Sequence, residues 1–204
     1  MVLSKKKARD VLEQIIALYP DVKTILTYRN NFELLIAVLL SAQTTDIAVN
    51  KVTPALFERF PTPKDFAIAS PEEIEPYIKT IGLYRNKAKH IYQCANQLVE
   101  QFNGEIPHTR TELESLAGVG RKTANVVLSV GFDIPAFPVD THVSRVCKHH
   151  KIVPQNATPL QIEKIVTGIL PRELWNQAHH SIIFFGRNIC SPRNPKCGEY
   201  IHID

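Results

Sequence analysis

The sequence of 204 residues predicts an all-α fold, and three observations carry this prediction. Residues 70–73 (SPEE), 111–114 (TELE) and 158–161 (TPLQ) each have the pattern of a capped helix start. Apolar residues recur at helical spacing in segments such as 11–19 and 162–169. No segment alternates strictly between apolar and polar residues beside an Asn-Gly or Asp-Gly turn, so no strand is expected.

Helix stops and one fully apolar segment organise the chain into about nine to eleven helices. The segment Phe32–Leu40 is apolar on all sides, which predicts a central helix covered by the others. Stops are expected at Gly82, at Asn103-Gly104 and at Gly131. The proline-rich PAFPVD at 135–140 is the expected hinge. We therefore expect a central domain over residues 21–133 and a second domain from residues 1–20 plus 134–204.

Composition and charge fit an intracellular protein that can bind nucleic acid. The net charge is +4, with +2 on residues 1–20, −1 on 21–133 and +3 on 134–204. This balance permits a nucleic-acid partner without requiring one. No apolar run reaches membrane-spanning length, and the four cysteines are too scattered for a disulfide scaffold. We expect a cytoplasmic protein, associated with the nucleoid if prokaryotic, without a membrane partner.

The segment ESLAGVGRKTANVVL at 114–128 contains a glycine turn between two expected helices. A nucleotide P-loop needs glycine directly before lysine, and Arg121 stands there instead. A dinucleotide-binding turn needs a third glycine where Thr123 stands. Such a turn can instead hold a phosphate of a nucleic-acid backbone on its amides without reading sequence. The alternative is a plain helix corner in which Gly118 is only a C-cap.

Several segments in the same order carry a family resemblance. LAGVGRKTANVVL followed by PVDTHVSRV resembles the helix-hairpin-helix and catalytic aspartate of the endonuclease III family of DNA glycosylases. FELLIAVLLSAQTTD at 32–46, IKTIGLYRNKAKHI at 78–91 and the segment from Cys190 to Cys197 resemble it too. The likeness covers about residues 10–198 and implies a two-lobe fold with DNA in the cleft between the lobes.

This resemblance implies a bifunctional DNA glycosylase and AP lyase that removes oxidised pyrimidines from duplex DNA. The nucleotide is flipped out of the helix, a lysine attacks the sugar C1′, and β-elimination cuts the strand 3′ to the abasic site. Lys122 matches that nucleophile. A nucleophilic amine must be neutral, and both the first turn of a helix and a partly buried pocket disfavour its positive charge. The alternative for Lys122 is an exposed cation beside phosphate.

Asp140 matches the family's catalytic aspartate. A carboxylate near C1′ can stabilise oxocarbenium-like charge and assist proton transfer from the lysine. The other interpretation is a helix N-cap, because Asp140 directly precedes a helical segment. The two roles are compatible, since a capping contact would orient the carboxylate.

Further residues are assigned to DNA by the same resemblance. Gln43 fills the gap left by the flipped nucleotide, and Leu83 is a wedge between bases. As alternatives, Gln43 is a loop amide and Leu83 accompanies a glycine cap. Asp46 and His142 match pocket positions. The expected backbone contacts are Gly118, Val119, Gly120, Arg121, Lys87 and Lys89.

Two alternative functions and the oligomeric state stay open at this point. Mismatch glycosylases of the superfamily have the same fold but generally lack the lysine found at Lys122. A non-catalytic DNA-binding module would have no need of Lys122 and Asp140 together. Oligomeric state is open, although a monomer suffices for the chemistry.

The C-terminal segment predicts no metal cofactor. The family commonly holds a [4Fe–4S] cluster on four cysteines with the spacing C-x6-C-x2-C-x5-C. Cys190 and Cys197 keep the first spacing, but Tyr200 occupies the third position and the fourth lies beyond Asp204. We expect a degenerate loop at 190–204 without a cluster, its cysteines being remnants. Zinc on two cysteines and histidines is disfavoured, because no Cys-x2-Cys or His-x3–5-His pattern completes a site.

Overall fold

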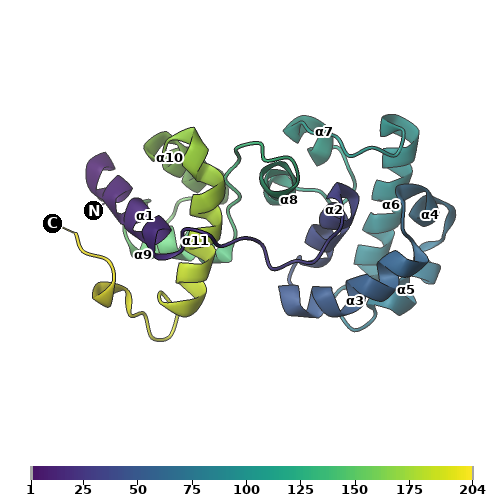
Figure 1. Ribbon diagram of the computed structural model, residues 1–204, viewed down its shortest axis with the longest axis horizontal. Helices are drawn as coiled ribbons and strands as arrows, with labels where there is room; N and C mark the ends of the chain where they lie inside the picture. Colours follow the sequence, from purple (N-terminus) through teal and green to yellow (C-terminus); the bar gives the residue numbers. More distant parts are fainter. Residues whose placement is uncertain (1, 204) are drawn as a thin grey trace. The chain divides into compact units, whose positions relative to one another are not determined.

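The computed structural model describes residues 2–203, and these form helices and contain no β-strand apart from an isolated bridge between Cys190 and Pro195. The described chain forms two compact units (Figure 1). The central unit spans Ile25–Phe132, and the terminal unit combines the residues up to Thr24 with those from Asp133 onward. The predicted all-α fold is confirmed. Among the described residues, no helix is both long and apolar enough to cross a membrane.

The central unit is built around one buried helix, α2 (Asn31–Leu40). Every residue from Phe32 to Leu40 is buried, as the apolar pattern predicts. Figure 1 shows α2 between α6 and α8 of this unit, and α3 also packs on it. The surrounding elements are α3 (Asp46–Arg59), α4 (Pro63–Ile68), α5 (Pro71–Ile78), α6 (Tyr84–Phe102), α7 (Arg110–Glu114), α8 (Arg121–Val126) and η1 (Val127–Gly131).

The terminal unit has its own core, in which α11 (Trp175–Asn188) packs against α1 and α9. Its other elements are α1 (Lys5–Leu18), α9 (Thr141–His149), α10 (Pro159–Ile169), η2 (Arg172–Leu174) and η3 (Cys197–Glu199). Side chains of α11 tie it to the end of α1: Gln177 and Ser181 both donate to the carbonyl oxygen of Tyr19, at 2.7 and 2.9 Å. The proline-rich segment before α9 has no regular secondary structure, and its residues 136–139 are buried.

The helix boundaries differ from the sequence prediction at two places. Thr109, not Thr111, caps α7, because its hydroxyl accepts the amide of Glu112. Both threonines are followed three residues later by glutamate, so the capping pattern occurs twice in overlapping registers. The helix expected to stop at Gly82 ends at Ile78 instead. The capping boxes at Ser70 and Thr158 and the stop at Asn103-Gly104 are confirmed.

Candidate functional site

The glycine turn joins α7 to α8 in a conformation that requires glycine at position 118. Gly118 has φ +76°, and a Cβ at this position would lie 3.0 Å from the Cβ of His90. Between the glycines, Val119 is buried and its amide donates to Leu116 O at 3.1 Å. Val119 therefore anchors the turn in the core with its side chain, while Gly120 begins α8.

A side chain of α6 holds this turn from behind. Gln97 accepts the amide of Ala117 at 2.7 Å and donates to the carbonyl oxygen of Ser115 at 3.0 Å. Both polar ends of one amide group are thus used on the loop between α7 and α8. Gln97 could not be identified from the sequence, because a single glutamine in a helix carries no signal for a partner about 20 residues away.

Lys122 lies in the first turn of α8, as predicted, and its side chain is exposed. The partly buried surroundings that we expected are not observed. Gly120 occupies the N-cap position and has no side chain, so no N-cap side chain accepts a backbone amide of the first turn of α8. The helix continues without a break into the π-helical turn η1, which ends at Gly131 as expected. The first amides of such a helix lack intrahelical acceptors and favour negative charge nearby.

Asp140 is the N-cap of α9 in the terminal unit. Its Oδ1 accepts the amide of Val143 at 2.7 Å, and the side chain is half-buried. The capping interpretation is therefore confirmed as a structural role. His142 follows in the same turn, where its Nδ1 lies 3.4 Å from Nη2 of Arg145. A hollow of about 750 Å³ extends along α9 and is lined by Asp140, Arg145 and His149 among others.

The two residues assigned to the base stack share an uncommon backbone conformation. Gln43 has φ 54° and Leu83 has φ 58°, in the left-handed region that side chains other than glycine rarely adopt. Both are exposed, and 55% of Leu83 is accessible despite its apolar side chain. Leu83 immediately precedes α6, and Asp46 opens α3 shortly after Gln43. Strained, exposed residues of this kind cluster at functional sites.

The cationic side chains expected to contact the DNA backbone differ in their exposure. Lys89 is exposed on α6, and Arg121 is half-buried at the start of α8. A phosphate contact by Lys87 requires an exposed ammonium, yet Lys87 is only 6% exposed. Its Nζ donates to Thr44 Oγ1 at 2.6 Å, and burial lowers the pKa of the ammonium. Lys87 is thus a correction to the predicted contacts: it fastens the loop that carries Gln43.

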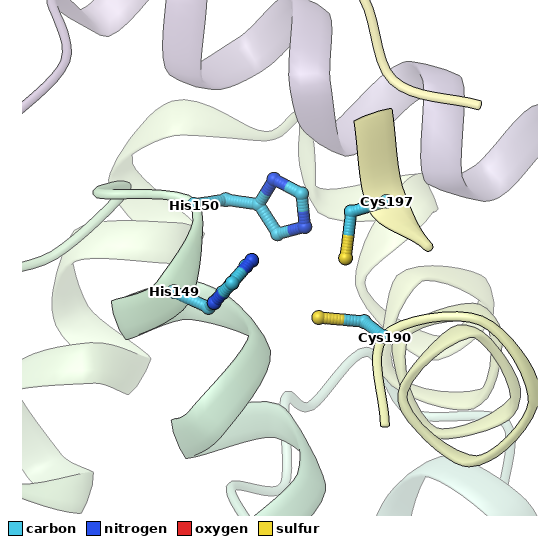
Figure 2. Close-up of side chains that lie close together, drawn as sticks. All are labelled: His149, His150, Cys190 and Cys197. Atoms are coloured by element: carbon cyan, nitrogen blue, oxygen red, sulfur yellow. The ribbon is translucent and has the colours of Figure 1, made fainter. Parts of the chain in front are cut away.

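The prediction that the chain holds no metal group is wrong. One ligand atom each of His149, His150, Cys190 and Cys197 lie within 4.8 Å of one another. Figure 2 shows the two imidazoles and the two sulfur atoms facing one common space. The imidazoles come from the end of α9, and the thiols come from the segment after α11. Four such donors, three of them buried, are suited to bind metal.

Burial shifts the pKa of two members of this group, His150 and Cys190. Burial, together with neighbouring His149, lowers the pKa of His150 to about 4, so its imidazole is neutral at pH 7. Burial and a hydrogen bond with Cys197 raise the pKa of Cys190 to about 12, so its thiol is protonated. Backbone contacts also hold the segment that carries the two cysteines. Lys196 N donates to Ile189 O at 2.9 Å, and Cys190 and Pro195 form an isolated antiparallel β-bridge.

Comparisons with known proteins agree with this architecture. Residues 36–172 match the model of the HhH-GPD superfamily of base excision DNA repair proteins. The chain is 45% identical to the endonuclease III of Bacillus subtilis (strain 168), over 97% of the chain and 90% of the relative. It is 43% identical to that of Escherichia coli (strain K12), over 98% and 94%.

The chain belongs to the endonuclease III family. A solved structure of a trapped endonuclease III–DNA covalent intermediate superposes with a TM-score of 0.93 at 48% identity, covering 96% of this chain and 92% of the other. A thermostable thymine-DNA glycosylase shares the fold, with a TM-score of 0.83 at 24% identity, covering 96% and 93%. The predicted family and the activity of a base-excision DNA glycosylase and AP lyase are confirmed.

Proposed function

We propose that the protein excises oxidised pyrimidines from duplex DNA by base flipping and then cuts the strand at the resulting abasic site. The observation that carries the chemistry is Lys122, exposed in the first turn of α8, two residues after Gly120, which provides no capping side chain. Endonuclease III relatives have been trapped covalently on DNA, and this chain matches such a structure over 96% of its length. The partner is duplex DNA with damaged or abasic sites, and a monomer suffices.

Lys122 acts as the nucleophile. Its neutral Nζ attacks C1′ of the flipped nucleotide, the glycosidic bond breaks, and the base leaves with a proton. Ring opening gives an imine between Nζ and C1′. Loss of a proton from C2′ and cleavage of the C3′–O bond then cut the strand on the 3′ side. The start of α8 favours the neutral amine, because the helix dipole disfavours a cation there.

Asp140 acts beside the sugar through its second carboxylate oxygen, the one that does not accept the helix amide. Oδ1 accepts the amide of Val143, which fixes the carboxylate on the first turn of α9. A fixed carboxylate stabilises the positive charge that develops at C1′ and accepts a proton from the attacking lysine. Asp46 and His142 belong to the pocket for the flipped base in this proposal.

Gln43 and Leu83 enter the base stack from two loops of the central unit. Both are exposed and held in the left-handed backbone region. The hairpin from Gly118 to Arg121 holds the DNA backbone, with Lys89 as an additional cation. The division into residues 21–133 and residues 1–20 with 134–204 belongs to the proposal. So does a cytoplasmic location, with nucleoid association in a bacterial host.

Covalent trapping tests the proposal. With borohydride present, the wild-type protein is expected to become linked to a duplex that contains an abasic site. Lys122→Gln should reduce trapping at least a thousandfold while duplex affinity stays within about threefold. Lys164→Gln is the matched control, because Lys164 is an exposed lysine of α10. Undiminished trapping by Lys122→Gln would refute the assignment of the nucleophile.

The same experiment separates the rival functions. A monofunctional mismatch glycosylase would release a base without forming a trapped adduct, and a non-catalytic module would bind without releasing a base. A panel of duplexes with thymine glycol, oxidised cytosines and mismatches then defines the lesion spectrum. Preference for a mismatch over every oxidised pyrimidine would contradict the proposed substrate class.

A further inference from the structure

We propose that His149, His150, Cys190 and Cys197 bind one zinc ion, which fastens the C-terminal segment to the end of α9. These side chains come from positions separated by about 40 residues in sequence, yet their ligand atoms lie within 4.8 Å of one another. In a tetrahedral zinc site, neighbouring sulfur atoms lie about 3.8 Å apart and neighbouring nitrogens about 3.3 Å apart. A modest contraction around an ion brings the present arrangement to that geometry.

A second observation points to an electrophile at this place. Nε2 of His150 is buried and has no hydrogen-bond partner, and the residue is 8% exposed. A buried ring nitrogen without a partner is costly unless something accepts its lone pair or its proton. A metal ion among the four donors would take that lone pair.

Charge balance favours a divalent ion. Cys190 and Cys197 are 1% and 5% exposed, so two bare thiolates there would be strongly disfavoured. A divalent ion that displaces both thiol protons leaves a neutral site of two thiolates, two imidazoles and one ion. Soft sulfur with imidazole in a tetrahedral set is the preference of zinc among divalent ions.

The donor set differs from the one that the family resemblance assigns to this loop. A [4Fe–4S] cluster is usually held by four thiolates, and Tyr200 occupies the position of the third cysteine. Two histidines of α9 complete the present set instead. A two-iron cluster on two cysteines and two histidines places each pair on a different iron. Four donors gathered around one space fit a single ion better.

The backbone prepares the site before any ion binds. The bridge between Cys190 and Pro195, and the bond from Lys196 N to Ile189 O, close the loop so that Cys190 and Cys197 meet. Arg145 of α9 donates to the carbonyl oxygen of Cys190, which joins this loop to the helix of the histidines. The ion would therefore act at the opposite end of α9 from Asp140, as a structural element outside the chemistry.

Metal analysis of the intact protein tests this inference independently of DNA cleavage. The full-length, untagged chain is purified without oxygen from cells supplied with both zinc and iron. We expect about one zinc per chain and no visible absorption band. X-ray absorption at the zinc edge should show two sulfurs at about 2.3 Å and two nitrogens at about 2.0–2.1 Å. Iron with a broad visible band, a Cys190–Cys197 disulfide, or metal-free protein would each overturn the inference.

Variants locate the ion. Cys197→Ser and His150→Asn should each lower zinc content at least tenfold. Cys94→Ser, which changes a buried free cysteine of α6 in the other unit, should leave it unchanged. If a ligand variant does not fold, cobalt is added to metal-stripped wild-type protein in its place. One equivalent should saturate a tetrahedral cobalt spectrum with sulfur-to-metal absorption, and its absence would count against the site.

Discussion

The α-helices of the described residues begin in two different ways. Eight of the eleven have an N-cap side chain that accepts a backbone amide of the first turn, from Ser4 before α1 to Thr158 before α10. Three lack such a bond: α6, preceded by Leu83, α8, preceded by Gly120, and α11. In α11 the 3-10 turn η2 precedes the helix and already orders its backbone.

The two remaining uncapped starts coincide with residues that the family resemblance assigns to DNA. Caps are the ordinary solution for the amides of a first turn, and a helix without one loses about 1 kcal/mol. Gly120 leaves the start of α8 without a capping side chain, and Leu83 starts α6 in a strained conformation. The DNA contacts proposed for these positions would account for the missing caps. Asp140 combines a structural and a functional role, because it caps α9 and is also the proposed catalytic carboxylate.

The largest expected effect separates the two roles of Asp140. Asparagine caps a helix as well as aspartate does, so Asp140→Asn should keep the unfolding free energy within about 0.5 kcal/mol. Base release should slow about 100-fold, because the amide carries no charge to stabilise the sugar cation. Single-turnover excision and urea denaturation measure the two quantities.

Asp140→Ala completes this comparison, since it removes the cap as well as the charge. It should lose about 1 kcal/mol of stability in addition to the slower excision. An unchanged excision rate in Asp140→Asn would leave Asp140 with the structural role alone.

The next effect concerns the uncapped start of α8. Gly120 has φ −94°, and a Cβ there meets no atom within 4 Å, so the position accepts a side chain. Gly120→Asp should stabilise the fold by about 0.3 kcal/mol as a cap, yet weaken duplex binding about tenfold by occupying the phosphate position. The log–log salt slope of binding should become shallower by about 0.9.

Gly168→Asp, in α10, is the charge-matched control for that variant. Its Cβ also meets no atom within 4 Å, and it changes the net charge equally. If both variants weakened binding to the same extent, the effect would come from overall charge and not from the start of α8.

Local patterns of the sequence were sufficient for much of the fold. The buried helix Phe32–Leu40 and the caps at Ser70 and Thr158 follow from residues adjacent in sequence. The cap of α7 could not be assigned, because Thr109 and Thr111 offer overlapping registers. In the structure the register with Thr109 as cap has Leu113 fully buried. Long-range packing, which the local pattern does not contain, selects between them.

The metal-ligand group could not be predicted for a similar reason. Its histidines are adjacent, so a search for histidines three to five residues apart passes over them. Cys190 lies about 40 residues later in the chain, so its proximity to the histidines depends on how α9 packs against α11. The one local signal in the sequence was the adjacent pair His149-His150, which the structure places at the end of α9. Likewise, the burial of Lys87 against Thr44 depends on a contact 43 residues apart.

The smallest expected effect concerns Leu83 at the start of α6. A residue other than glycine in the left-handed region costs about 1 kcal/mol, and the exposed side chain of Leu83 contributes little packing in return. Leu83→Gly should therefore raise the unfolding free energy by about 0.5 kcal/mol, part of the gain being offset by the larger entropy of glycine in the unfolded chain. Asn103→Gly is the matched control, since Asn103 has φ 53° at the other end of the same helix. Both variants should gain stability in urea denaturation, whereas only Leu83→Gly should slow excision several-fold, because the wedge between bases is lost. Equal excision rates in the two variants would mean that the strain at Leu83 serves the local fold and not the DNA.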